Sequence, residues 1–228
     1  MYKKLIKKII FWFDAYRFLA SRFIYKNRDF LGDKILDYGS GSGHYEPFLK
    51  DLVGTYLKCD IQNENVDILI NQNNINISDN YFNSVVCLDV LQHSENPKKN
   101  LKEIHRVLKP NGFLILSVAS NCPEADFLDF SRWSKKGIEN LLKKNNFRDI
   151  EIYQRGGILF LLITNIFMYL NNVLIGNRID WKIMSRFLRF TLMCIKAIFT
   201  PLLFMALLID FFIPKGNSYF GLLIKAKK

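Results

Sequence analysis

The fold of this chain is indicated by one stretch, KILDYGSGSG at residues 34–43. The apolar pair Ile35-Leu36 ends at the acid Asp37, alternating glycines follow, and residues 45–50 read as the start of a helix. Glycine adopts positive φ without steric cost and lets the backbone approach a ligand where a Cβ would intrude. The stretch therefore predicts a strand, a tight turn and a helix, with a ligand at the turn. A glycine turn without a ligand is the alternative.

The spacing of the glycines separates two classes of ligand. A dinucleotide-binding turn needs the pattern G-x-G-x-x-G. Here the third glycine is Gly43, one position early, and His44 stands where that pattern has glycine. The carboxylate of Asp37 would repel a pyrophosphate and attract an ammonium group. The turn therefore favours a nucleoside that carries an amino-acid group over a phosphate-rich one.

A second acid follows at the expected distance. Residues 55–60 read as a strand that ends in Asp60. This acid lies about twenty residues beyond the turn, the separation at which a carboxylate reaches a ribose in nucleotide-binding α/β units. A solvated aspartate at a strand end is the alternative for Asp60 alone, but the turn and the acid together favour a nucleoside site.

Strands and helices alternate along the next part of the chain. The predicted strands cover residues 67–70, 84–88, 113–118 and 148–154, the predicted helices 97–108 and 134–146, with an asparagine-rich loop at 71–76 and a turn at 109–112. This order predicts an α/β fold, a doubly wound parallel sheet with right-handed crossovers. Ligands bind such sheets at the carboxyl ends of the strands, where Asp37, Asp60 and Asp89 all fall.

Four segments differ in composition. They are an amphipathic helical pattern at 1–30, the alternating region at 31–155, a strongly apolar insert at 156–216, and a last strand with a basic tail at 217–228. The first segment is expected either to lie in a membrane interface or to pack on the domain and cap its ligand cleft.

Charge and cysteine content narrow the class of partner. The net charge of +11 suits an anionic partner. The basic residues are not interleaved with aromatic residues as in an RNA-binding surface, so a membrane surface is favoured over nucleic acid. The four cysteines form no C-x-x-C pair and the three histidines show no metal-ligand spacing. We expect free thiols in a reducing cytoplasm and no metal site.

The apolar insert contains two runs, 156–175 and 187–213, and each approaches the length that crosses a bilayer. Between and beside them lie the basic residues Arg178, Lys182, Arg186 and Arg189. A spanning hairpin would carry these charges to the outer side, against the positive-inside tendency. Helices that lie in the leaflet at the cytoplasmic face are therefore favoured. A spanning hairpin and a dimer interface or lid over an apolar substrate remain alternatives.

Taken in order, the motifs resemble those of the class I S-adenosylmethionine (SAM) dependent methyltransferases, in particular the small bacterial type that includes quinone-biosynthesis and glycan-cluster enzymes. The motifs are ILDYGSGSG at 35–43, Asp60, DNYFNSVV at 79–86, VLQHSENP at 90–97 and EIHRVLKPNG at 103–112. The resemblance covers residues 30–154 and the final strand. It implies a Rossmann-like, seven-stranded sheet with the helical insert between its last two strands, and SAM as the cofactor.

The resemblance also implies roles for single residues. Asp37 would hold the methionine ammonium, Asp60 would accept hydrogen bonds from the ribose hydroxyls, and Asn71 would stand near the adenine amine, where the family usually has an acid. The cofactor-binding residues so implied are Asp37, Gly39, Ser40, Gly41, Gly43, Asp60, Ile61, Asn71, Gln72, Leu88 and Asp89.

The expected reaction is in-line transfer of the SAM methyl group to a nucleophile, for which the protein mainly aligns the two reactants and excludes water. A poorly acidic hydroxyl would need a general base, and His93, which would border the active site, is the first candidate and Asp89 the second. Packing at a helix start is the alternative role of His93. Residues that could line the acceptor site are Asn121, Asp126, Asp129 and Trp133.

A membrane-docked methyltransferase would most simply meet a lipid-linked acceptor, such as a polyprenyl-linked glycan or a quinone precursor, although a small-molecule acceptor is also open. Two other hypotheses compete with this one. The first is a non-catalytic membrane interaction protein with a degenerate SAM-binding fold. The second is an RNA methyltransferase, which the apolar insert does not favour.

Overall fold

The computed structural model describes residues 15–61, 65–71, 74–124, 129–175, 186–213 and 216–228. The described elements are, in chain order, α2 (Ala15–Lys26), β1 (Lys34–Tyr38), α3 (Glu46–Leu49), β2 (Thr55–Asp60), β3 (Ile68–Asn71), β4 (Asn74–Ile75), β5 (Phe82–Leu88), α4 (Pro97–Val107), β6 (Leu108–Ala119), α5 (Lys135–Lys144), β7 (Arg148–Arg155), α6 (Ile158–Ile175), α7 (Arg186–Phe212) and β8 (Gly221–Lys227). Short 3-10 turns lie at Arg28–Phe30 and Leu91–His93.

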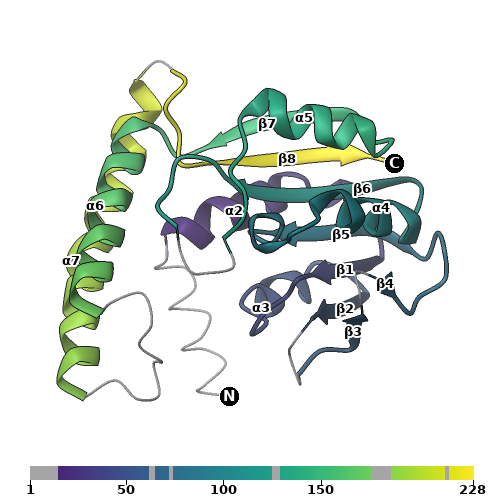
Figure 1. The fold of residues 1–228 in the computed structure, drawn as a ribbon, viewed down its shortest axis with the longest axis horizontal. Coiled ribbons are helices and arrows are strands. Elements are labelled where there is room, and N and C mark those ends of the chain that lie inside the picture. The colour runs from purple at the N-terminus through teal and green to yellow at the C-terminus, as the bar shows by residue number, and fades with distance from the viewer. Residues whose placement is uncertain (1–14, 62–64, 72–73, 125–128, 176–185, 214–215) are drawn as a thin grey trace.

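The strands form one sheet in the order β4-β3-β2-β1-β5-β6-β8-β7 (Figure 1). β3, β2, β1, β5 and β6 run parallel, whereas β8 is antiparallel to both β6 and β7. This confirms the predicted doubly wound α/β class. Because β1 lies between β2 and β5, its last residues meet the ends of both neighbours, with Asp37 opposite Lys58 and Val86.

The described sheet has eight strands, whereas seven were expected. The additional strand is β4, in the segment predicted to be a loop, and it pairs antiparallel with β3 through Ile70 and Ile75. Ile75 is buried and its backbone N–H donates to Oε1 of Glu103 at 2.7 Å. One buried apolar side chain and one side-chain acceptor from α4 are therefore enough to hold a two-residue strand among asparagines.

The structure also differs from the prediction at residues 109–112, which were expected to form a turn. These residues belong to β6, which begins directly after α4 at Leu108, and the register shifts between Phe82 and Ser84 of the neighbouring β5. Asn111 adopts a φ of +63° and a Cβ on Gly112 would lie 2.8 Å from the carbonyl oxygen of Asn83. Proline, asparagine and glycine thus form an irregular strand start here, and the helix still ends where they predict.

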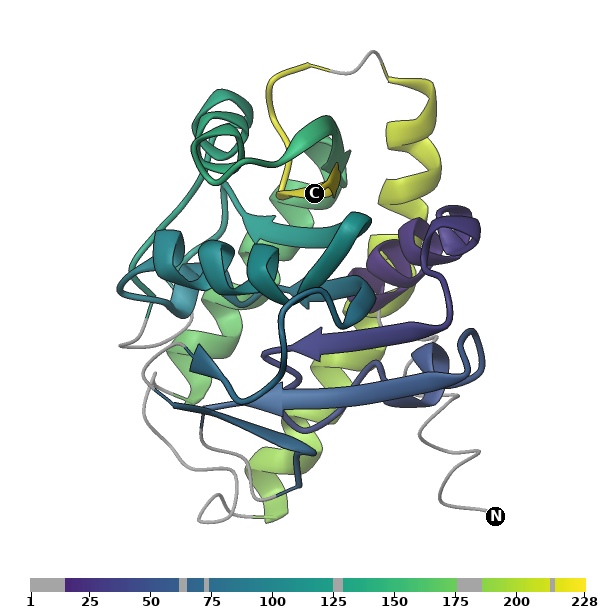
Figure 2. The same ribbon diagram turned by 90° about the vertical axis from the view of Figure 1, so that its right-hand side faces the viewer.

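Helices cover both faces of the sheet. Figure 2 shows α4 and α5 on one side of the strands and α2 on the other. On the first side, Leu101 and Ile104 of α4 and Ile138 and Leu142 of α5 join one buried cluster. On the second side, Ala20, Phe23 and Ile24 of α2 pack in another cluster with Ile35, Val86 and Ile115 of the central strands. Side chains of the central strands point alternately to the two faces of the sheet, and helices cover each face.

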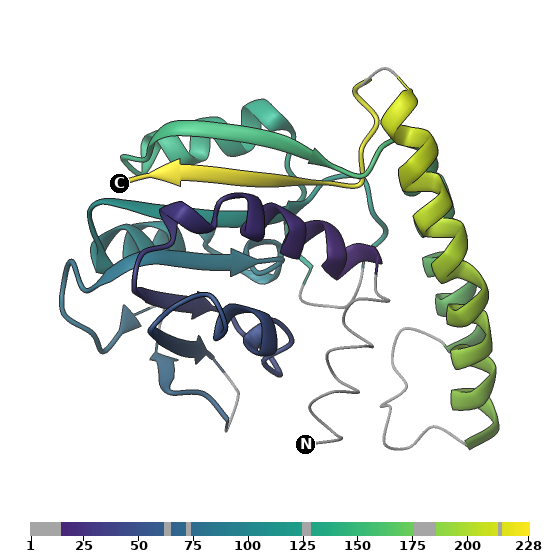
Figure 3. The same cartoon turned by 180° about the vertical axis from the view of Figure 1, so that it is seen from behind.

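The apolar insert forms a helical hairpin, α6 and α7, between β7 and β8, as predicted. It stands at one end of the sheet, beside α2 (Figures 1 and 3). Its inner face joins α2 and the residue before β8 in a third cluster that includes Ala15, Phe160, Ala206 and Phe220. Among the described residues, no helix is long and apolar enough to cross a membrane.

Three hydrogen bonds to one carboxylate fix the start of the hairpin. The carboxylate of Asp210, near the end of α7, accepts hydrogen bonds from the backbone N–H groups of Gly157, Leu159 and Phe160 at 3.1, 3.0 and 2.9 Å. These are N–H groups that the first turn of α6 leaves without helical partners. A Cβ on Gly157 would lie 2.5 Å from Cγ of Asp210, so a glycine is required for this close approach.

Candidate active site

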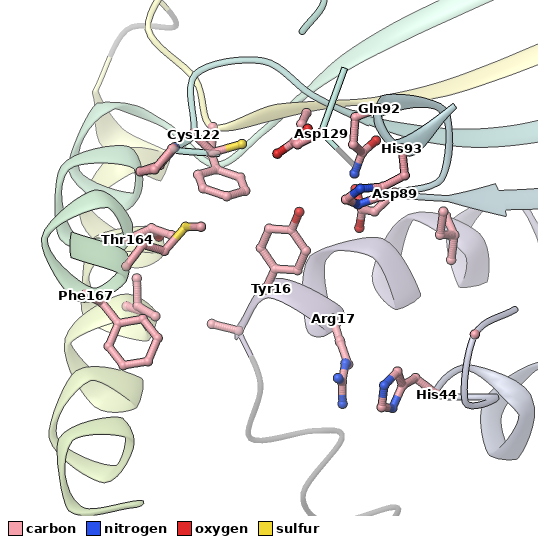
Figure 4. A pocket seen from close by; sticks show the side chains of 18 of the residues that line it. Tyr16, Arg17, His44, Asp89, Gln92, His93, Cys122, Asp129, Thr164 and Phe167 are labelled. Atoms are coloured by element: carbon pink, nitrogen blue, oxygen red, sulfur yellow. The ribbon is translucent and has the colours of Figure 1, made fainter. Parts of the chain in front are cut away.

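A cavity of about 490 Å³ lies at the carboxyl ends of the central strands (Figure 4). The strand side of the cavity is formed by the glycine turn after β1, the end of β5 and the turn that follows it. The opposite side is formed by the first turn of α2 and by the inner faces of α6 and α7. The cavity therefore joins the nucleoside site expected from the sequence to the apolar insert.

The glycine turn approaches the cavity closely. Gly39 has a φ of +71°, and a Cβ at this position would lie 2.4 Å from Cγ2 of Val90. Gly41 has a φ of +53°, and no described atom lies within 4 Å of a Cβ placed on it. The N–H groups of Gly39 and Ser40 donate to the carbonyl oxygen of Cys59 at 2.9 and 3.0 Å. The turn is thus tied to β2 and leaves open space beside Gly41.

Asp37 is a buried carboxylate in the floor of this site. Only 3% of the residue is exposed, and the hydroxyl of Tyr56 donates to Oδ2 at 2.5 Å. Burial raises the pKa of Asp37 from 3.8 to about 7, although the hydrogen bond from Tyr56 acts in the opposite direction. A cation beside Asp37 would restore its ionised form, so the site is suited to an ammonium group.

Asp60 holds the glycine turn from the side. Its Oδ2 accepts from the N–H of Gly41 and its Oδ1 from the N–H of Ile61, each at 2.7 Å. A carboxylate has about four acceptor positions, so both oxygens can accept further hydrogen bonds. Asp60, at the end of β2, is therefore hydrogen-bonded to the turn that follows Asp37 on the neighbouring strand β1.

Asp89 follows β5 and is engaged in a buried ion pair. It has a φ of +55°, and its carboxylate accepts from Oγ of Ser117 at 2.9 Å. Nη1 of Arg155 lies 2.8 Å from both of its carboxylate oxygens. Because the carboxylate is bonded to a permanent cation, the geometry favours a positioning role for Asp89 over the role of general base.

Arg155 and Tyr16 were not found by the sequence reasoning. Arg155 is 1% exposed, and its Nη2 donates to the carbonyl oxygen of Tyr16 at 2.9 Å. Its guanidinium lies 3.5 Å from the centre of the Tyr16 ring, and Tyr16 extends into the cavity (Figure 4). Burial raises the pKa of Tyr16 well above its ordinary value. The first turn of α2 thus lies at the cleft. Residues 1–14 of the first segment lie outside the described residues, so both alternatives for that segment stay predictions. The sequence signal that could have identified Arg155 was its position as a single cation directly after the predicted strand 148–154.

His93 and Gln92 lie beyond the end of β5, in the turn Leu91–His93. Both line the cavity, and Figure 4 shows them beside Asp89. Gln92 is 5% exposed, and its Oε1 is buried without a hydrogen-bond partner among the described residues. Its carbonyl oxygen accepts from the N–H of Phe130 at 2.7 Å, which fixes the backbone.

The part of the cavity next to the hairpin is mainly apolar. It is lined by Phe160, Thr164, Phe167, Met168, Phe199 and Leu203. Asp129 also lines the cavity, and its side chain is bonded to both Nη atoms of Arg132. Arg132 in turn donates to the carbonyl oxygen of Pro123 at 3.0 Å. The acid at this wall is therefore compensated by an adjacent cation.

The structure brings half of the residues implied by the sequence to one cavity. Those that line the cavity are Asp37, Gly39, Ser40, Gly41, Leu88, Asp89, His93 and Asp129. Of the described residues, others on the same list lie outside its lining, namely Gly43, Asp60, Ile61, Asn71, Asn121 and Trp133. Gln72 and Asp126 lie outside the described residues. The roles of all these residues stay predictions.

Comparison with known proteins gives a family and a fold. Residues 11–152 match the family described as a methyltransferase domain. The chain is similar to a SAM-dependent methyltransferase from Archaeoglobus fulgidus, with 14% identity, a TM-score of 0.56, and coverage of 92% of this chain and 93% of that one. A second SAM-dependent methyltransferase, from Aquifex aeolicus, gives 20% identity and a TM-score of 0.50, with coverage of 68% and 92%.

A third similar structure is phosphoethanolamine N-methyltransferase 2 from Haemonchus contortus, solved in complex with S-adenosyl-L-methionine. The identity is 14% and the TM-score 0.56, with coverage of 95% of this chain and 56% of that one. No curated protein sequence matches the chain. At these identities the structural likeness establishes the fold, and the family match extends over more than half of the chain.

Proposed function

This chain belongs to the methyltransferase-domain family and is a SAM-dependent methyltransferase, and on that premise we propose that it acts at a membrane surface and methylates a lipid-linked acceptor of the glycan or quinone type. One observation carries the proposal. The α6–α7 hairpin lines the cavity with its inner face and exposes large apolar side chains on its outer face. The methyl-transfer site and an apolar surface therefore belong to the same two helices.

The residues of the strand side fit the methyl donor. Asp37 would hold its ammonium group, Gly39 and Gly41 would admit its methionyl chain, and Asp60 would accept from its ribose hydroxyls. Oγ of Ser40 is buried at this wall without a hydrogen-bond partner among the described residues, as expected of a group that a ligand completes. When bound, SAM supplies a methyl group that its sulfonium already activates. The Haemonchus contortus enzyme, which has a similar fold, was solved in complex with SAM, and this supports SAM as the donor.

The chain's own residues would orient the acceptor and move one proton. Phe160 and Phe167 of the hairpin and Phe220 of the chain before β8 exclude water from the cavity. For a hydroxyl acceptor, the oxygen gains the methyl group while a ring nitrogen of His93 takes the hydroxyl proton. Arg155 holds Asp89 beside this position, so Asp89 shapes the site and His93 remains the candidate base.

The outer face of the hairpin supports the membrane assignment. Its exposed large apolar side chains are Leu162, Ile166, Tyr169, Leu170, Ile198, Leu202, Met205, Leu208, Ile209, Phe211, Phe212 and Ile213. Phe211 and Phe212 are 81% and 83% exposed. Exposed apolar side chains in such number on one pair of helices are typical of a protein or membrane contact. Residues 176–185 lie outside the described residues, and their sequence contains the basic residues Arg178 and Lys182, which favour anionic lipid head groups as the partner.

The catalytic part is tested with radiolabelled SAM. The purified full chain is incubated with methyl-labelled SAM and vesicles of phosphatidylglycerol and phosphatidylethanolamine that carry a bacterial lipid extract. We expect label in the lipid fraction with the wild type and none with Asp37→Asn. Label that enters only water-soluble compounds would contradict a lipid-linked acceptor.

The membrane part is tested by flotation with the same vesicles. Leu208→Ser and Phe212→Ser should each reduce the floated fraction, because each removes exposed apolar surface from the hairpin. Leu69→Ser is the matched control, since Leu69 is 59% exposed but lies on β3. Equal loss in all three variants, or no flotation of the wild type, would argue against docking by the hairpin.

A further inference from the structure

Two buried polar side chains line the cavity on its acceptor side, and each has a polar atom without a hydrogen-bond partner among the described residues. They are Gln92, in the turn after β5, and Thr164, on the inner face of α6. Gln92 is 5% and Thr164 6% exposed, and neither Oε1 of Gln92 nor Oγ1 of Thr164 finds a hydrogen-bond partner among the described residues. Buried polar groups are nearly always hydrogen-bonded, because an unpaired one destabilises the fold. Two such groups at one cavity therefore indicate a ligand with matching polar groups.

The surroundings of these two residues define the rest of the ligand. Figure 4 shows Thr164 on the hairpin side of the cavity and Gln92 on the strand side. Around Thr164 the lining consists of Phe160, Phe167 and Met168 together with residues of α7. This wall would take an apolar chain.

The two carboxylates nearby are already compensated. Asp89 is paired with Arg155, and Asp129 is paired with Arg132. A strongly ionic ligand would have to compete with these pairs. The acceptor side of the cavity thus offers neutral hydrogen-bonding groups within an apolar wall.

We propose that Gln92 and Thr164 determine acceptor specificity by binding an amphiphile whose head group carries a hydroxyl. The amide oxygen of Gln92 accepts from this hydroxyl, which is a different hydroxyl from the one whose proton His93 takes. The hydroxyl of Thr164 bonds a second polar group closer to the apolar chain, and that chain lies along the inner face of the hairpin. The inference rests on the proposed function in one respect, because the bound amphiphile is taken to be the methyl acceptor.

The test uses a pair of probes that differ in one hydrogen-bond donor, para-octylphenol and its methyl ether para-octylanisole. Binding to the full chain is measured by displacement of anilinonaphthalene sulfonate in the presence of saturating SAM. The wild type should bind the phenol about tenfold more tightly than the ether, as one hydrogen bond allows. Thr164→Val and Gln92→Leu keep the volume but remove the polar atoms, and each should reduce this ratio. Thr164→Ser keeps the hydroxyl and should preserve it.

Thermal unfolding separates ligand recognition from a structural role. If the two groups serve a ligand, Thr164→Val and Gln92→Leu each remove an unpaired buried polar atom and should raise the Tm of the protein without the probes by about 2–4 °C. A structural role predicts a lower Tm. An unchanged phenol-to-ether ratio in both variants, or no discrimination by the wild type, would overturn the inference.

Calorimetric titration of SAM keeps the two proposals apart. The wild type and both variants should bind SAM equally, because Gln92 and Thr164 face the acceptor. If the wild type bound no SAM but discriminated between the probes, the proposed function would fail and the amphiphile site would stand. If SAM bound normally and discrimination were absent, only the amphiphile site would fail.

Discussion

Nη1 of Arg155 lies 2.8 Å from both carboxylate oxygens of Asp89, so the end of β7 is joined to the end of β5 at the cavity. The Arg155 side chain is fully buried, and Asp89 is 19% exposed. The same guanidinium donates through Nη2 to the carbonyl oxygen of Tyr16. One side chain thus connects the sheet, the helix α2, whose first turn lies at the cleft, and the start of the hairpin, which follows Arg155 directly.

Removing this guanidinium should destabilise the protein strongly. Arg155→Met leaves Asp89 with a largely buried charge and no cation, and we expect the free energy of unfolding to fall by about 3 kcal/mol. Arg155→Lys keeps the charge but not the forked geometry and should lose less. Urea denaturation measures both. As a control, Lys143→Ala breaks the exposed Lys143–Glu139 pair and should cost less than about 0.5 kcal/mol. A similar small effect at Arg155 would contradict the importance of the buried pair.

The raised pKa of Asp37 predicts that SAM binding depends on pH. Burial raises this pKa to about 7, and the ammonium group of SAM requires the ionised carboxylate. The affinity for SAM, measured by calorimetry, should therefore fall about tenfold for each pH unit below 7. Tyr56→Phe removes a hydrogen bond that lowers the pKa, so the inflection should move to higher pH. Affinity that does not change between acid and neutral pH would refute this role of Asp37.

The same group affects stability with the opposite sign in the protein without ligand. Its folded-state pKa of about 7 lies above the ordinary value of 3.8. The contribution of Asp37 to stability is therefore largest below pH 3.8 and is lost as the pH rises toward 7, because unfolding releases the carboxyl to ionise. Asp37→Asn should remove this component from the pH dependence of unfolding.

Asp210 should stabilise the hairpin. Asp210→Ala removes three hydrogen bonds to the first turn of α6, and we expect a loss of about 1–2 kcal/mol, as for other helix caps. Because α6 lines the cavity, the same variant should also bind para-octylphenol more weakly, as measured by displacement of anilinonaphthalene sulfonate. Ser134→Ala is the matched control: it removes the cap that accepts from Gly137 at the start of α5, away from the cavity. This variant should lower the free energy of unfolding by about 1 kcal/mol and leave the binding of para-octylphenol unchanged.

Gly39 and Gly41 should respond differently to alanine. Gly39→Ala places a Cβ 2.4 Å from Val90 at positive φ and should destabilise the fold strongly. Gly41→Ala meets no described atom within 4 Å, so only its left-handed backbone costs about 1–2 kcal/mol. Its methyl group nevertheless enters the open space beside the turn and should weaken SAM binding. Gly216→Ala, in open space without positive φ, should change neither Tm nor SAM affinity.

Local patterns were enough to predict the sheet and the glycine turn. The run from Ile35 to Gly43 combines a buried strand, a strand-end acid and glycines that take positive φ, and each of these requirements is local. The insert could also be predicted, because two long apolar runs between predicted strands most simply form a pair of helices. β4 was missed because its pairing depends on Glu103, a distant residue that accepts from the N–H of Ile75.

The acceptor side of the site depends on contacts that no local pattern contains. Arg155 is 66 residues from Asp89 and 139 from Tyr16 in the sequence. Thr164 is one of several polar residues in an apolar helix, and only the packing of α6 against the cavity distinguishes it from a solvent-facing threonine. Burial and the absence of a hydrogen-bond partner among the described residues are properties of the folded chain, so they cannot be inferred from the sequence.

The central claim is that SAM occupies this cavity with its ammonium group on Asp37. The most direct test is calorimetric titration of SAM into the purified full chain and into Asp37→Asn, at a pH above the pKa of Asp37. The account predicts that the wild type binds SAM and that Asp37→Asn binds it at least about tenfold more weakly, because a charge-assisted hydrogen bond is lost. Equal binding by the two proteins, or no binding by the wild type, would contradict it.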